Sequence, residues 1–231
     1  MPFLWSMCDD GLFNLALILE FGNSDLEFSA ICYTLRCLWP RLDDCMFGIY
    51  GVNGGAVELS EYESYMALAL DEAGKALKDG EFPVGCVIAS QGRVVSTGSR
   101  KGTASAVLRA SEIDHAEIRA LKYLETFGGE FDPGEAAVFC TMEPCLMCFG
   151  AILLSGIRTI VYAYEDVMGG GTGCDLSGLP VLYRQNKVAV ISGVLRDRSL
   201  ALFQDFFNKP DNHYWKGSLL EQYTLDQKIP G

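Results

Sequence analysis

Histidine is the scarcest chemically versatile residue in this 231-residue chain, which contains only His115 and His213. Any reaction that needs an imidazole must therefore use one of these two positions. Long apolar runs are also missing, and a stretch such as 12–19 is far too short to cross a bilayer. The first residues lack the positive charge of a secretion signal, and Asp9 and Asp10 precede the one apolar stretch that could serve as its core. We therefore expect a cytoplasmic protein.

Cysteine is plentiful, but its pattern does not indicate a disulfide framework. The chain has nine cysteines, an odd number, so at least one cannot be paired. In a reducing compartment their spacing matters more, because thiolates there bind metals or carry out redox chemistry. Basic residues are fewer than acidic ones: the chain has 18 lysines and arginines and 30 aspartates and glutamates, which gives a formal charge of −12. This balance weakens the case for tight electrostatic binding of a phosphate backbone without excluding it.

Hydrophobic periodicity predicts the fold. Apolar residues recur at steps of three and four between residues 59 and 80, which predicts an amphipathic helix with Ser60 as its N-cap. The patterns beyond it predict strands at 84–89, 93–97, 136–142, 159–164 and 188–193, and helices at 115–126, 144–156, 197–208 and 216–226. This order predicts an α/β fold, a three-layer α/β/α sandwich with one mixed sheet.

Three segments follow from the same patterns. Residues 1–55 show no sustained period and form an N-terminal extension of unknown role, residues 56–208 form the main domain, and residues 209–231 form a C-terminal helix and tail. An alternative for the extension is an accessory metal site made by Cys32, Cys37 and Cys45, although their spacing matches no familiar zinc pattern. The run 168–173, with four glycines, is expected to be a flexible loop.

Two short motifs carry the chemistry: His115-Ala116-Glu117 and Pro144-Cys145-Leu146-Met147-Cys148, each at a predicted helix start. The two cysteines are three residues apart, so both sulfurs project from one face of the first turn, where the helix dipole favours thiolates. With His115 they supply three zinc ligands, which leaves the fourth tetrahedral position to water, as in catalytic zinc sites. Zinc lowers the pKa of that water to about 7, and Glu117 is then placed to move protons.

Other functions for these residues stay open at this point. The Cys-x-x-Cys pair alone could be a redox dithiol, which would leave Glu117 unexplained. A closed structural zinc site would recruit a fourth ligand such as Cys140 or Cys174. The protein would then be a non-catalytic, zinc-stabilised binding protein, which has no need of Glu117. Cys86 and Cys140 are better interpreted as small buried strand residues.

From about residue 59 to residue 207 the chain resembles the cytidine/deoxycytidylate deaminase superfamily, and within it the bacterial tRNA-specific adenosine deaminases and nucleoside deaminases. The resemblance rests on the two motifs, on Glu81-Phe82-Pro83-Val84-Gly85-Cys86-Val87, on the glycine-rich loop and on Asp205-Phe206-Phe207. It implies a cytidine-deaminase-like fold, a homodimer, and a zinc-dependent deaminase domain in which Glu117 is the proton shuttle. The zinc ligands would be His115, Cys145 and Cys148, and the expected substrate contacts are Val84, Ala116, Arg100 and Phe207.

The chain departs from that family at points that bear on the substrate. Where the family has an asparagine after its second strand, this chain reads Gly98-Ser99-Arg100-Lys101, and the basic continuation after the Phe-Phe pair is missing. Tyr214 and Trp215 either stack on a base or anchor a terminal helix. Two substrates stay open: the wobble adenosine of a tRNA, or a free nucleoside or nucleobase of guanine, adenine or cytosine type. The candidate phosphate contacts for a tRNA are Arg100, Lys101, Arg109 and Lys209.

Overall fold

The computed structural model describes residues 6–7, 13–14, 59–104, 110–126 and 131–229. The chain divides into two compact units, Met1–Ala56 and Val57–Gly231. In the first unit, β1 (Ser6–Met7) pairs antiparallel with β2 (Phe13–Asn14). The three cysteines considered for an accessory metal site, at positions 32, 37 and 45, lie outside the described residues. Among the helices of the described ranges, none combines the length and hydrophobicity needed to cross a bilayer.

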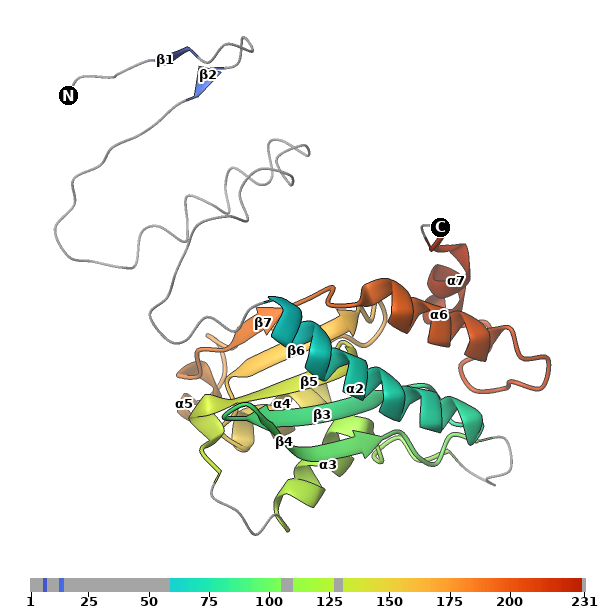
Figure 1. Ribbon diagram of the computed structural model, residues 1–231, viewed down its shortest axis with the longest axis horizontal. Helices are drawn as coiled ribbons and strands as arrows, with labels where there is room; N and C mark the ends of the chain where they lie inside the picture. Colours follow the sequence, from blue (N-terminus) through green and yellow to red (C-terminus); the bar gives the residue numbers. More distant parts are fainter. Residues whose placement is uncertain (1–5, 8–12, 15–58, 105–109, 127–130, 230–231) are drawn as a thin grey trace, which may run out of the picture. The chain divides into compact units, whose positions relative to one another are not determined.

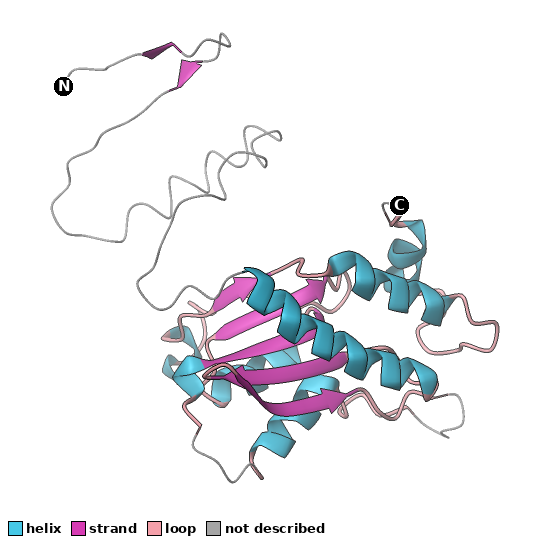
Figure 2. Ribbon diagram, in the orientation of Figure 1, coloured by secondary structure: helices cyan, strands magenta, loops and turns pink. Residues whose placement is uncertain are grey.

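A five-stranded sheet forms the centre of the second unit (Figure 2). In spatial order its strands are β4 (Arg93–Ser99), β3 (Gly85–Ser90), β5 (Ala136–Met142), β6 (Thr159–Tyr164) and β7 (Ala189–Ile191). Strand β3 is antiparallel to both β4 and β5, whereas β5, β6 and β7 run parallel to one another. The parallel pairs need crossover connections, which the chain makes through helices and loops between successive strands. The prediction of one mixed sheet is confirmed.

Helices cover both faces of this sheet (Figure 1). On one face lie α2 (Leu59–Lys78) and α6 (Arg196–Phe207), and on the other lie α3 (Ala116–Leu124) and α4 (Leu146–Leu154). The last helix, α7 (Leu219–Asp226), packs on α6, while η1 (Pro133–Glu135) and α5 (Val181–Arg184) are single turns. The predicted three-layer sandwich is therefore confirmed.

Alternating strand residues divide the interior into two apolar cores. Val87, Phe139 and Val161 face α2, where they pack with Met66 and Ala69. Their neighbours one position along each strand face α3 and α4 instead, because successive side chains of a strand point to opposite faces. This second core contains Ile88, Val138, Ile160, Ala120 and Ile152.

The C-terminal residues pack against the same unit. Leu220 is buried in the second core, and the Tyr164 hydroxyl lies 3.1 Å from Thr224 Oγ1. The Tyr223 hydroxyl donates to Glu165 at 2.6 Å. Together these contacts hold α7 beside the end of β6. This arrangement places residues 214–220 next to the helix starts that carry the two motifs.

Candidate active site

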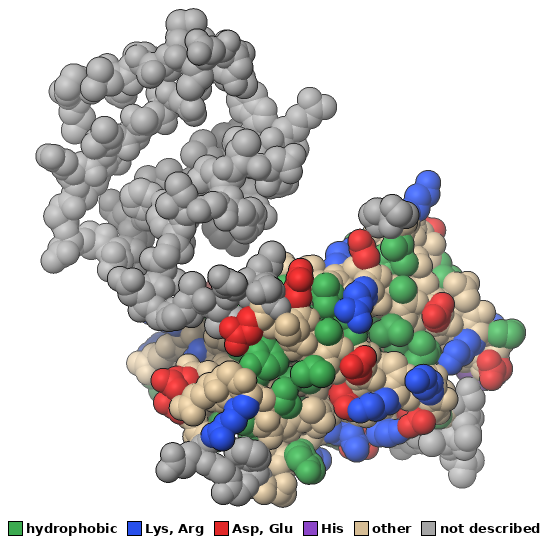
Figure 3. Space-filling view, viewed as in Figure 1, with side chains coloured by type: hydrophobic (Ala, Val, Ile, Leu, Met, Phe, Trp, Pro, Cys, Tyr) green, Lys and Arg blue, Asp and Glu red, His purple; other side chains and the backbone are tan. Residues whose placement is uncertain are grey.

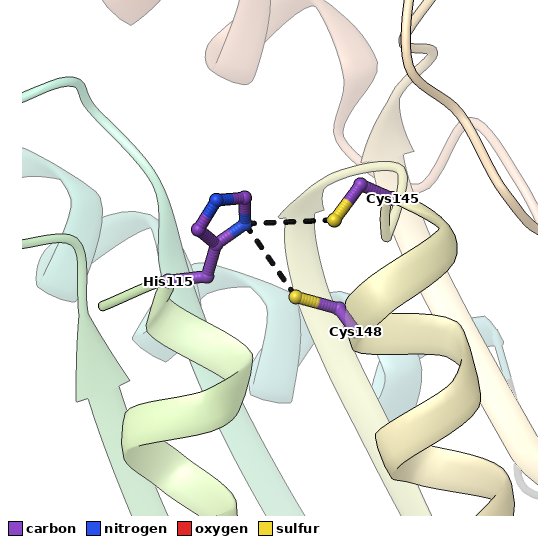
Figure 4. Close-up of side chains that lie close together, drawn as sticks. All are labelled: His115, Cys145 and Cys148. Atoms are coloured by element: carbon purple, nitrogen blue, oxygen red, sulfur yellow. Dashed lines mark hydrogen bonds between the residues drawn. The ribbon is translucent and has the colours of Figure 1, made fainter. Parts of the chain in front are cut away.

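The two motifs meet because they begin neighbouring helices. His115 is the N-cap of α3 and Cys145 is the N-cap of α4. Figure 4 shows the imidazole and both thiols pointing toward one another. His115 Nδ1 lies 3.7 Å from Cys145 Sγ and 3.5 Å from Cys148 Sγ, and all three ligand atoms lie within 4.8 Å of one another. Tetrahedral zinc with ordinary bond lengths would separate its nitrogen and sulfur ligands by about 3.5–3.8 Å. These residues therefore fit one zinc ion.

The thiols are electrostatically suited to a cation. A hydrogen bond from Cys148, together with the nearby His115, lowers the pKa of Cys145 to about 4. The same hydrogen bond and burial raise the pKa of Cys148. The pair thus favours one thiolate, and a divalent cation would displace the remaining proton. The backbone N–H of Cys148, in the first turn of α4, donates a hydrogen bond to Cys145 and adds to this preference.

Glu117 is the buried carboxyl of the site. It lies in the first turn of α3, exposes 3% of its surface, and its Oε2 has no hydrogen-bond partner among the described residues. Burial raises the pKa of this carboxyl above its ordinary value. A buried carboxylate oxygen without a partner is costly, so this position would be unfavourable in a protein selected for stability alone. A water molecule on a zinc ion bound by the neighbouring residues would supply the missing partner.

A cavity of about 80 Å³ opens onto this group. Of the substrate contacts predicted from the sequence, Val84, Ala116 and Arg100 line the cavity, whereas Phe207 lies behind Phe82, with ring centroids 6.0 Å apart. Tyr214 and Trp215, for which the sequence left two roles open, also form the wall of the cavity. The cavity lining is completed by Phe82, His115, Glu117, Met142, Glu143, Cys145, Asp166, Gly169, Tyr214, Trp215 and Leu220.

Tyr214 and Trp215 contact the core as helix anchors would, and stacking on a base stays a prediction. They pack against the apolar core, and they also line the cavity. Trp215 has a φ of 59°, a left-handed conformation that is rare for a bulky residue and that marks a locally strained turn. His213, the second histidine, is exposed and does not line the cavity.

The glycine-rich loop is fixed closely against the cysteine turn, which differs from the flexible loop we expected. Glu143 accepts hydrogen bonds from Thr172 and from the backbone of Asp166, and Gly171 N donates to Pro144 O at 2.9 Å. A Cβ at Gly171 would lie 2.5 Å from the backbone nitrogen of Leu146. The loop therefore needs glycine for close approach.

The alternative of a closed structural zinc site finds no support among the described residues. Cys140 Sγ lies 4.0 Å from Cys86 Sγ on the neighbouring strand, and both side chains are fully buried, as predicted. Cys174 is exposed. Within the described ranges, the group of metal-binding side chains found is His115, Cys145 and Cys148, which leaves one position open for water.

Comparison with known proteins agrees with this site. The family "Cytidine and deoxycytidylate deaminase zinc-binding region" matches residues 59–164. The chain is 31% identical over 153 residues to the tRNA-specific adenosine deaminase of Streptococcus pyogenes serotype M18, covering 65% of this chain and 92% of that protein. It is 30% identical to the protein of the same name from Bacillus subtilis strain 168, over 65% of this chain and 91% of that protein.

A solved structure from a study of A-to-I editing by tRNA:A34 deaminases is also similar, with a TM-score of 0.48 and 30% identity over 60% of this chain and 98% of that one. The fold and the three-ligand site define a zinc-dependent deaminase, a hydrolase acting on C–N bonds. The chain belongs to the cytidine and deoxycytidylate deaminase family.

Proposed function

We propose that this protein hydrolytically removes the exocyclic amino group of a nucleobase, with Glu117 as the proton carrier. The observation that carries this proposal is the buried, unpartnered Glu117 Oε2 beside three zinc-ligand side chains in one cavity. Bound zinc would activate a water molecule by lowering its pKa to about 7. Glu117 accepts a proton from the attacking water and passes it to the ring nitrogen beside the amino-bearing carbon. A second transfer protonates the amino group, so that a C–O bond forms, the C–N bond breaks and ammonia leaves.

For the substrate class, the geometry favours a free nucleobase or nucleoside. A tRNA enzyme needs several cations that are free to contact phosphates. Here Arg100 exposes only 2% of its surface, Lys101 Nζ lies 2.6 Å from Asp79, and Lys209 Nζ donates to Leu77 O at 3.0 Å. Arg109 lies outside the described residues. On the face seen in Figure 3, basic and acidic side chains are interspersed, without a continuous basic stripe among the coloured residues.

The second candidate is an adenosine in tRNA. Two relatives that carry the name tRNA-specific adenosine deaminase favour this substrate, because the match to this chain covers 91–92% of their own length. Both substrate classes use the same zinc ligands and the same proton carrier. They differ in whether a phosphate backbone contributes to binding.

One experiment separates the two candidates. Ammonia release is measured with a panel of nucleobases, nucleosides and deacylated tRNA, and kcat/KM for the best substrate is followed against salt. Each phosphate contact adds about 0.7–0.9 to the slope of log affinity against log salt. We expect a nearly flat dependence that Lys101→Glu leaves unchanged, as does the exposed control Lys122→Glu. A steep slope that flattens only in Lys101→Glu would support the tRNA substrate instead.

We further propose a cytoplasmic homodimer. Metal-binding thiolates suit a reducing compartment, as does the Cys86–Cys140 pair, which is not joined by a disulfide. Helix α4 exposes Leu146 and Leu154, and Leu154 also lines a surface hollow with Leu121 and Phe131. A second copy would remove these apolar side chains from water. Light scattering should give twice the chain mass, and Leu154→Asp should give the single-chain mass with zinc still bound. A wild-type protein of single-chain mass would contradict the dimer.

A further inference from the structure

Arg100 differs from the other basic side chains of the site region because it is buried. It follows β4 directly, exposes 2% of its surface and lines the cavity. Its backbone N–H donates to Val84 O at 2.9 Å, which ties it to the loop before β3. A desolvated guanidinium is costly unless its N–H groups are used, because the group carries charge and has five donors.

Only one end of this guanidinium is satisfied. Nη2 donates to Ser111 O at 2.6 Å and to the Tyr214 hydroxyl at 3.2 Å, and it lies 3.4 Å from Glu112 Oε2. Tyr214 in turn donates to the same carboxylate at 3.0 Å. Nη1 is buried and has no hydrogen-bond partner among the described residues. The clamp on Nη2 thus holds the side chain still, and the buried, unpartnered Nη1 belongs to a side chain that lines the cavity.

The partner that Nη1 lacks must be an acceptor, because a guanidinium can only donate. The charge of the cavity indicates which kind of acceptor can bind there. Glu117, Glu143 and Asp166 line the same cavity, and Glu112 already pairs with Arg100 from the other side. An anionic group would be repelled by these carboxyl groups, whereas a neutral carbonyl oxygen would not. A carbonyl oxygen also forms a strong, charge-assisted hydrogen bond with an arginine, as guanine O6 does in protein–DNA contacts.

We propose that Arg100 determines substrate specificity by donating a hydrogen bond from Nη1 to a carbonyl oxygen of the base. The cavity then selects a base that carries both an amino group and an oxo group, of guanine or cytosine type, over adenine. This inference rests on the proposed function, since it takes the cavity as the base-binding site. A hydrogen bond to a charged group makes a difference of about 10- to 100-fold in affinity.

The test uses pairs of ligands that differ in the carbonyl group: guanine with 2-aminopurine, and cytosine with 4-aminopyrimidine. Dissociation constants are measured by calorimetry on the full-length, zinc-loaded Glu117→Gln protein, so that turnover does not consume the ligand. In at least one pair the oxo base should bind about 10- to 100-fold more tightly. Arg100→Met, which keeps the side-chain length and removes the donors, should reduce that ratio to near one. The matched control Arg119→Met makes the same substitution at an exposed arginine that does not line the cavity, so it should retain the ratio.

Three results would overturn the proposal: equal binding within both pairs, adenine binding as tightly as the better oxo base, or a ratio that survives in Arg100→Met. The first two are read from the protein with Arg100 intact, so they remain decisive if Arg100→Met does not fold. Ammonia release by the wild-type protein is measured separately on the same ligands. Absence of ammonia together with carbonyl-dependent binding would contradict the proposed deamination and leave the role of Arg100 standing.

Discussion

Replacing Glu117 with glutamine tests the proposed proton carrier with the least change in shape. The side chain is buried in the first turn of α3, and glutamine has nearly the same size. The amide cannot accept and return protons at the required steps. General acid–base catalysis by one group raises the reaction rate about 10²–10⁴-fold. In the proposed mechanism Glu117 carries a proton in more than one step. We expect kcat to fall by at least 10²-fold, with the three zinc ligands still in place.

The same substitution should not weaken the fold. Because burial raises the pKa of Glu117 in the folded state, its contribution to stability is greatest at low pH and is lost as the pH rises past the ordinary value of a glutamate. At pH 7, above the ordinary pKa of a glutamate, burial of this carboxyl therefore opposes folding, whereas a glutamine carries no such pH-dependent penalty. The Tm of Glu117→Gln at pH 7 should equal or exceed that of the wild type, which is the opposite of what loss of a structural residue would do.

The assay combines ammonia release, zinc content and thermal unfolding on the same preparations. Turnover within threefold of the wild type, at equal zinc content, would show that Glu117 does not carry the protons. A lower Tm with lost zinc would show that the carboxyl supports the metal site, and the catalytic interpretation of its burial would be wrong.

The domain boundary and the glycine-rich loop beside the cysteines can also be tested. Deleting residues 1–50 should leave zinc content and ammonia release unchanged, because the second compact unit begins at Val57; an insoluble or zinc-free truncation would refute this domain boundary. Gly171→Ala should lower the Tm and weaken zinc retention, since its Cβ would lie 2.5 Å from Leu146 N, whereas the control Gly173→Ala meets nothing within 4 Å. Equal Tm values for the two glycine variants would argue against close packing of this loop.

Local patterns predicted most of the fold. The bounds of β5 and β6 agree with the sequence, because each is a short apolar run between clear turn residues. Strand β7 is shorter than the expected 188–193, since it pairs only with β6 at the sheet edge. Helix α2 begins at Leu59, so Ser60 lies within the helix and not at the predicted N-cap position. Helix α7 begins three residues later than expected, because Ser218 caps it by accepting from Glu221 N.

The metal site was predictable to the residue, whereas the walls of the cavity were not. Each motif is local, and its residue types and spacing are specific for one chemistry. Tyr214 reaches the cavity wall through contacts with Phe82, Arg100 and Glu112, which lie far from it in the chain, and no short pattern encodes them. The sequence predicts Arg100 as a substrate contact and as one of the candidate phosphate contacts, but no short pattern indicates that it is buried. Its burial follows from the clamp by Ser111 and Tyr214, which are 11 and 114 positions away in the chain.

A titration of metal against activity tests most directly whether His115, Cys145 and Cys148 hold one catalytic zinc. The purified, reduced protein is stripped with a chelator and reconstituted stepwise with zinc, while ammonia release from the best nucleobase substrate is measured. X-ray absorption then reports the ligand set at full occupancy. We predict that activity rises linearly to one zinc per chain, with one nitrogen, two sulfurs and one water-type oxygen around the ion. Activity independent of zinc, or a fourth protein ligand on the ion, would contradict the account.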